Sequence, residues 1–156
     1  MTAGRGCPYR AAETTKGTAV ASDPIFHIAF PVNDLDEARA FYTGLLGCTE
    51  RPEKVFDGLA TLNFFGAQLV MVEAPDEVQA PPPSDRPVPT KHFGIIMEWD
   101  AWHAMAEKLR AADVEFVWGP NVTKHEAIGE VGSLFINDPS GNSLEFKSYR
   151  DRSKIL

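Results

Sequence analysis

The sequence is poor in cysteine, in basic residues and in long apolar runs, and each shortage excludes a class of protein. Two cysteines in 156 residues, Cys7 and Cys48, are too few for a disulfide framework, so a reducing, cytoplasmic setting is expected. The 15 Lys and Arg are outnumbered by 22 Asp and Glu, and the net charge of −7 argues against a nucleic-acid partner. The longest apolar stretches, such as residues 93–97, fall far short of the ~20 residues that cross a bilayer, so no membrane partner is expected.

Two segments lack the periodicity of helices and strands. Residues 1–23 contain Thr, Ala, Gly and Ser with almost no apolar periodicity and are predicted to form a disordered N-terminal tail. Their basic residues leave organellar targeting open as an alternative to the cytoplasm. Residues 80–89 contain five prolines, which block helix and central strand and predict an extended linker.

The linker separates two segments with the same order of elements, residues 25–79 and 90–150, within one domain spanning residues 24–151. Each segment begins with a β-type run, continues with a helix and ends in two or three short strands. The sequence therefore predicts an α+β fold in which two similar modules pair their sheets into one curved sheet with the helices outside. The cleft inside that sheet is the default ligand site.

Helix signals mark both segments. Asp34 followed by Glu37 is a capping-box pattern, and Gly47 stands where a C-terminal glycine belongs. In the second segment a helix is expected from Asp100, with one apolar stripe at helical spacing. The stripe consists of Ala101, Met105, Leu109 and Ala112.

Strand alternation places three side chains that can bind a metal on the face of the sheet away from the helices. They are His27 in the first strand, His92 at the strand after the linker, and Glu145 in the last strand. Two imidazoles and one carboxylate form a facial triad that leaves open positions on the ion, the pattern of non-heme Fe(II) oxygenases. The same set can hold Mn(II), Zn(II) or Ni(II), so the donor types alone leave the metal open.

Residues 27–47, 92–113 and 132–149 resemble the vicinal oxygen chelate superfamily of glyoxalases, bleomycin- and fosfomycin-resistance proteins and extradiol dioxygenases. The resemblance is carried by HIAFPVNDLDEARAFYTGLLG in the first segment and by LFINDPSGNSLEF before the end of the second. It implies two paired βαβββ modules that form a curved mixed sheet around a metal-bearing cleft. It also implies that the three residues named above are the metal ligands.

The resemblance further implies a metal-dependent enzyme whose small-molecule substrate chelates through two vicinal oxygens. A three-ligand site resembles that of the extradiol dioxygenases, which favours Fe(II) and dioxygen as co-substrate. Two alternatives stay open: a glyoxalase- or fosfomycin-resistance-type lyase or transferase using Mn(II), Ni(II) or Zn(II), and a metal-free binding module. The assembly is open as well, because the modules can pair within one chain or between the chains of a homodimer.

Three further residues are expected at the cleft. Aligning the two final hairpins puts Met71 opposite Glu145, where glyoxalase I has a fourth ligand, and Glu73 would take that place only if the register slipped by two. His125, in a long loop before the next strand, is a candidate general acid or base by resemblance to extradiol enzymes. Tyr149 shares the strand face of Glu145 and is a candidate hydrogen-bond donor to substrate.

Overall fold

The computed structural model of the chain describes residues 24–53, 56–79 and 86–156. Two predictions lie outside these ranges. They are the disordered tail at residues 1–23, with the targeting role left open for it, and residues 80–85 of the linker. Within the described ranges, no helix is both long and apolar enough to span a membrane.

Each module contains a four-stranded mixed sheet with the same topology. In the first, the strands lie in the order β1-β4-β3-β2, with bounds β1 (His27–Val32), β2 (Thr49–Glu50), β3 (Leu59–Phe64) and β4 (Ala67–Glu73). In the second, the order is β5-β8-β7-β6, with bounds β5 (Phe93–Met97), β6 (Phe116–His125), β7 (Gly129–Asn137) and β8 (Ser143–Tyr149). The first strand of each module pairs in parallel with the last, and the other pairs are antiparallel. The expected pair of βαβββ modules is confirmed.

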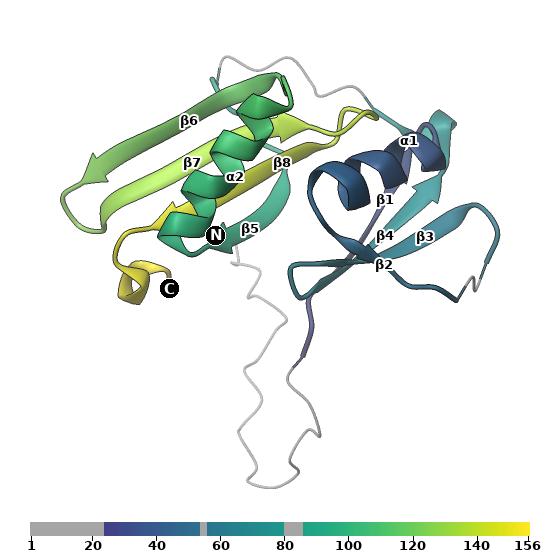
Figure 1. Cartoon of the computed structure of the whole chain (residues 1–156), viewed down its shortest axis with the longest axis horizontal. Helices are drawn as coiled ribbons and strands as arrows, with labels where there is room; N and C mark the ends of the chain where they lie inside the picture. Colours follow the sequence, from purple (N-terminus) through teal and green to yellow (C-terminus); the bar gives the residue numbers. More distant parts are fainter. Residues whose placement is uncertain (1–23, 54–55, 80–85) are drawn as a thin grey trace, which may run out of the picture.

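The helix of the first module begins at its predicted cap. The Asp34 carboxylate accepts hydrogen bonds from the backbone N–H groups of Asp36 and Glu37, both at 2.8 Å, and α1 (Leu35–Arg39) follows. The helix continues as a wider π-helical segment, η1 (Ala40–Leu45). Gly47 then turns the chain at φ +85°, a left-handed conformation that glycine adopts without strain. Figure 1 shows both helices lying across their own sheets.

The helix of the second module, α2 (Trp99–Ala111), is rotated from the expected stripe. It buries Met105 and Leu109 as predicted, but its other buried positions are Trp102 and Ala106, while Ala101 and Ala112 are exposed. The Trp102 side chain fixes this orientation because it is the tryptophan of the helix that is buried against the sheet. Its indole N–H donates to the carbonyl of Phe146 at 2.9 Å, and a Cβ on Gly132 would lie only 3.0 Å from its ring.

The region before Ser133 was predicted to be a long loop, and this prediction is wrong. The structure has a long β-hairpin there. β6 and β7 pair from Phe116↔Ile136 to His125↔Gly129. Residues 121–127 at its outer end are all exposed, so they show no apolar alternation, and the sequence pattern of a half-buried strand is missing. Short 3-10 turns, η2 (Pro75–Glu77) and η3 (Arg152–Lys154), complete the elements of the described residues.

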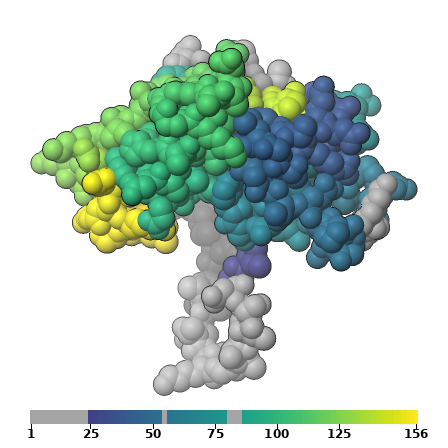
Figure 2. Space-filling model, viewed as in Figure 1, coloured from purple at the N-terminus to yellow at the C-terminus, as the bar shows by residue number. Residues whose placement is uncertain are grey.

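One apolar core joins the two modules. The rings of Phe30 and Phe93 lie 4.9 Å apart, and those of Phe64 and Phe146 lie 6.3 Å apart. The buried hydroxyl of Tyr42 donates to the Asp138 carboxylate at 3.0 Å, which adds a polar link across the same contact. Figure 2 shows the two modules meeting along a seam. This contact fixes how the modules sit relative to each other within one chain.

The turn at residues 138–142 reinforces that contact. The Asn33 N–H donates to the hydroxyl of Ser140 at 2.8 Å, and the amide of Asn142 donates to the carbonyl of Pro31 at 3.0 Å. Asp138 holds the turn itself by accepting from the N–H groups of Ser140 and Asn142. A turn of the second module is thus bonded to the end of β1 in the first.

Candidate functional site

Two of the predicted metal ligands meet over the second sheet. His92 stands just before β5 and Glu145 lies in β8, and the His92 Nε2 atom is 3.3 Å from the Glu145 Oε2 atom. They line an open pocket of about 340 Å³ together with Lys147 and Tyr149. Leu144 and Phe146, which flank Glu145 in β8, are fully buried on the other face, so the strand alternation predicted for this site is confirmed.

A glycine allows the two strands that carry these ligands to approach closely. Gly94 is paired with Glu145, and a Cβ atom at position 94 would lie 1.7 Å from the Glu145 carbonyl oxygen. Any larger residue would therefore push β5 away from β8. The close approach brings His92 within reach of the Glu145 carboxylate.

Hydrogen bonds orient both groups of this pair. The His92 Nδ1 atom lies 2.8 Å from the carbonyl oxygen of Pro89; because a carbonyl can only accept, Nδ1 carries a proton, and in the neutral form of the ring Nε2 has the lone pair. Ser133 donates its hydroxyl to the Glu145 Oε1 atom at 3.0 Å. The Nε2 lone pair and the carboxylate Oε2 thus face each other, an arrangement that requires a proton or a metal ion between them.

His27 is held in the same tautomer on the first sheet. Its Nδ1 atom lies 2.8 Å from the side-chain oxygen of Gln68, its cross-strand partner in β4. The amide oxygen can only accept, so the proton is on Nδ1 and the Nε2 lone pair faces outward. An outer oxygen that fixes the ring in this way is typical of metal-binding histidines.

A single chain does not bring His27 to the other two ligands. Among the described residues, no group of three His, Cys, Asp or Glu side chains is arranged to hold one ion. The inter-module core, including the Phe30–Phe93 contact, holds the two sheets in this arrangement. The set His27, His92 and Glu145 therefore stays a prediction.

The expectation for Met71 is wrong. Met71 is fully buried in the core beside Leu69, away from the open face. The register pairs Ile28↔Leu69 and Phe93↔Leu144 make Val70 the counterpart of Glu145. The alignment from sequence was displaced by one residue, which moves a strand residue to the opposite face. Glu73 does not supply the fourth ligand either, because its carboxylate accepts a hydrogen bond from the backbone N–H of Leu35 at 3.3 Å.

The two candidate catalytic residues differ in their surroundings. Tyr149 lines the pocket of His92 and Glu145, and its ring centroid lies 5.7 Å from the Lys147 Nζ atom. His125 ends β6 at the outer tip of the hairpin, where it is exposed and its Nε2 atom lies 3.0 Å from the Thr123 hydroxyl. His125 does not line the pocket within one chain, so its acid–base role stays a prediction.

Sequence reasoning missed the residues that orient the ligands. Gln68 follows from the pairing of β1 with β4, so a correct strand register would have revealed it. Ser133 lies on β7, whose start was predicted within a loop, and its contact with Glu145 needed the pairing of β7 with β8. Both contacts are tertiary, and no local motif encodes them.

Two paired βαβββ modules, each a four-stranded mixed sheet with a helix across it, define a class of proteins with the glyoxalase-type fold. Residues 25–146 match the family described as the Glyoxalase/Bleomycin resistance protein/Dioxygenase superfamily. The chain belongs to this family, which includes both glyoxalases and dioxygenases.

Individual relatives agree with this assignment. A glyoxalase/bleomycin resistance protein/dioxygenase from Alicyclobacillus acidocaldarius is 32% identical, with a TM-score of 0.71 over 86% of this chain and 97% of that chain. Virulence protein STM3117 of Salmonella typhimurium is 28% identical over 81% of this chain and 85% of its own length. A lactoylglutathione lyase from Agrobacterium tumefaciens shares the fold, with a TM-score of 0.56 at 19% identity over 82% of this chain and 95% of that chain.

Proposed function

We propose that the protein is a metal-dependent enzyme in which His27, His92 and Glu145 hold one divalent ion. The observation that carries this proposal is the 3.3 Å approach of the His92 Nε2 atom to the Glu145 carboxylate, with the proton fixed on Nδ1 by Pro89. The chemistry of the donors fits a metal, since neutral imidazoles and a carboxylate are ordinary ligands of Fe(II), Mn(II), Zn(II) and Ni(II). When bound, the ion would act as a Lewis acid that holds two vicinal oxygens of the substrate.

We infer that the site is completed between two copies of the chain. His27 of one copy would approach His92 and Glu145 of the other, which leaves the inter-module core of each chain intact. We call His27 the first half-site and the pair His92 and Glu145 the second half-site. Exposed apolar side chains beside both half-sites support this arrangement. Phe26, next to His27, is 67% exposed, and Ile96, in the pocket of His92, is 41% exposed. A second copy seated over these faces would bury them.

We propose Fe(II)-dependent oxygenation of the extradiol type as the reaction. Val70 occupies the position equivalent to Glu145, so the first module offers no carboxylate there and a three-residue ligand set leaves positions open. A catechol-type substrate would bind through its two oxygens, and one dioxygen molecule would enter the product with both atoms. Tyr149 and Lys147 line the same pocket and can donate hydrogen bonds to the substrate oxygens.

The experiment is metal analysis followed by oxygen labelling. Purified protein is analysed for iron, manganese, nickel and zinc, loaded anaerobically with Fe(II), and exposed to ¹⁸O₂ with a panel of catechols and hydroquinones. We expect one O₂ consumed per substrate and both labelled atoms in the product. His92→Ala should abolish the reaction, whereas His103→Ala, an exposed histidine on α2, should leave it intact.

Two results would contradict this proposal in different ways. Tight retention of Mn(II), Ni(II) or Zn(II) with no labelled product from iron-loaded protein would replace oxygenation by a lyase or transferase reaction. Protein that binds no divalent metal at all would replace the enzyme by a small-molecule binding module.

A further inference from the structure

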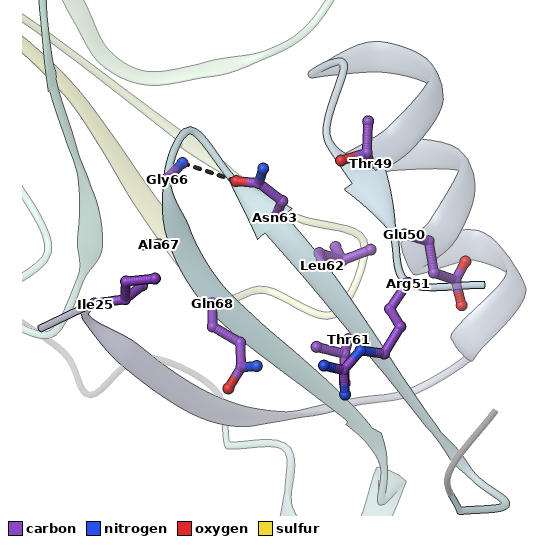
Figure 3. A pocket seen from close by; sticks show the side chains of 10 residues that line it. All are labelled: Ile25, Thr49, Glu50, Arg51, Thr61, Leu62, Asn63, Gly66, Ala67 and Gln68. Atoms are coloured by element: carbon purple, nitrogen blue, oxygen red, sulfur yellow. Dashed lines mark hydrogen bonds between the residues drawn. The ribbon is translucent and has the colours of Figure 1, made fainter. Parts of the chain in front are cut away.

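A second pocket lies on the open face of the first module, beside His27. It has a volume of about 400 Å³ and is formed largely by β2, β3 and β4. Figure 3 shows the side chains that line it, with the Arg51 guanidinium beside Thr61. Five of the polar ones are Thr49, Arg51, Thr61, Asn63 and Gln68.

The pairing of the strands connects this pocket to the proposed metal ligand. His27 is opposite Gln68, Gln68 is opposite Asn63, and Asn63 is opposite Thr49, so one polar row crosses the whole sheet. Three strand spacings separate β1 from β2, roughly 14 Å at about 4.8 Å each. Arg51, just beyond β2, reaches back over the sheet toward Thr61 (Figure 3), whose carbonyl accepts its backbone N–H at 2.9 Å.

Arg51 is the one basic side chain among the described residues that line the pocket. Glu50 also lines it, and its two carboxylate oxygens each accept from the Arg39 Nε atom at 3.1 Å, while the same guanidinium also pairs with Asp36 at 2.9 Å. Among the described residues, Arg51 forms a 4.0 Å ion pair with Glu53, and the two side chains are 51% and 76% exposed. A long contact between exposed groups contributes little, and a guanidinium is well suited to bind a carboxylate with two parallel hydrogen bonds.

We infer that Arg51 binds a carboxylate of the substrate. The inference rests on the proposed function, because the pocket adjoins His27 through Gln68. The substrate would carry vicinal oxygens at one end and a carboxylate at the other, separated by about a ring and a short chain. Thr61 and Gln68, which lie between the two ends in the same pocket, would donate hydrogen bonds along the molecule.

The test compares two probes of the same shape on zinc-loaded protein, which cannot oxidise them. The probes are 3-(3,4-dihydroxyphenyl)propionate and its neutral amide, and binding is measured by isothermal titration calorimetry. A charged hydrogen bond of this kind should make the propionate bind about tenfold more tightly than the amide. Arg51→Gln should remove this preference and Arg51→Lys should keep part of it. Arg110→Gln, a matched exposed arginine on α2 that pairs with Glu107, should keep all of it.

The outcomes separate this inference from the proposed function. If zinc is retained but both probes bind equally, or if Lys147→Gln removes the preference and Arg51→Gln does not, the assignment to Arg51 is wrong and the metal site stands. If the protein retains no metal, the proposed function is wrong, and the Arg51 pocket is tested by NMR titration of the metal-free protein with 3-phenylpropionate. Shifts near Arg51 and Thr61 that vanish in Arg51→Gln would then support it, and their absence would overturn it.

Discussion

The two modules have the same topology but divide the chemistry unequally. Both pair their first strand in parallel with their last, and both carry an outward-facing histidine held through Nδ1. The second module places Glu145 beside its histidine, whereas the equivalent position of the first is Val70. The open face of the first module carries Arg51 and a polar row, whereas that of the second carries Lys147 and Tyr149, which lie at other positions of the sheet.

This difference shows how a repeated fold can specialise without changing its backbone. Burial on the helix side constrains both modules to the same apolar pattern, so the open faces are where they can diverge. One face supplies most of the proposed metal ligands, and the other supplies a histidine and the proposed carboxylate site. In the proposed site, neither face holds all three metal ligands by itself.

Removing the carboxylate should break the second half-site most severely. Glu145→Gln replaces a charged ligand with a neutral one, and we expect zinc affinity to fall by at least about 100-fold, beyond the roughly 10–100-fold cost of losing an outer partner. Competition with a chromogenic chelator measures this. Glu107→Gln, with a side chain 72% exposed on α2, is the control and should leave the affinity unchanged. Equal affinity of the two variants would remove Glu145 from the site.

Crowding the close strand approach should destabilise the second module. In Gly94→Ala the new Cβ would lie 1.7 Å from the Glu145 carbonyl oxygen, and we expect a loss of about 2–3 kcal/mol in the free energy of unfolding. The equivalent position in the first module is Ala29, which already has a Cβ. Urea unfolding monitored by circular dichroism measures the loss. Gly44→Ala, with nothing within 4 Å of the new Cβ, should be neutral or stabilising. Similar stability of Gly94→Ala and wild type would show that the two strands can separate at no cost.

A glutamate at position 70 should give the first module the same histidine and carboxylate pair that the second module has. Val70→Glu places a carboxylate beside His27, and we expect metal to be retained about tenfold more tightly, by roughly 1.4 kcal/mol. Oxygen consumption should fall because the new ligand occupies a position otherwise open to substrate. The sequence-matched change Val72→Glu, two residues further along β4, tests whether the effect depends on position. Unchanged metal retention in Val70→Glu would mean that residue 70 does not face the ion.

Weakening the polar link between the modules should have a comparably small effect. Tyr42→Phe removes the hydroxyl that donates to Asp138, and we expect a loss of about 1–2 kcal/mol at neutral pH. Burial raises the pKa of Asp138, although hydrogen bonds from Asn142, Tyr42 and Ser140 oppose this. A raised pKa means that the folded state takes up a proton at higher pH than the unfolded state, so stability falls as pH rises between the unfolded and folded pKa values.

The raised pKa of Asp138 also determines how the stability cost of the Tyr42→Phe variant depends on pH. Loss of the hydroxyl should raise the pKa of Asp138 further, so the cost of the variant should be largest above the folded pKa and should shrink once the carboxyl is protonated. Urea unfolding at neutral and mildly acidic pH, compared with wild type, measures this. A cost that grows on acidification would contradict the account of the link.

The sequence predicted the fold well and the site in part, and particular residues show why. The Asp34 cap, the alternation around Glu145 and the outward-facing histidines follow from local rules, so they could be predicted. The place of Met71 depended on an exact strand register, and the contacts of Gln68 and Ser133 depended on strand pairing between distant segments. The orientation of α2 depends on the packing of Trp102 over Gly132. The spacing of apolar residues along the helix does not predict this contact.

The claim that two chains share one site can be tested by complementation. His27→Ala and Glu145→Ala chains, carrying different tags, are purified singly and after co-expression, and zinc content is measured for each. The account predicts no tightly bound zinc in either variant alone and about one ion per mixed dimer, because the intact His27 of one chain meets the intact His92 and Glu145 of the other. Mixed dimers that bind no zinc, while the wild type binds it, would show that the ligands come together within a single chain and would contradict the account.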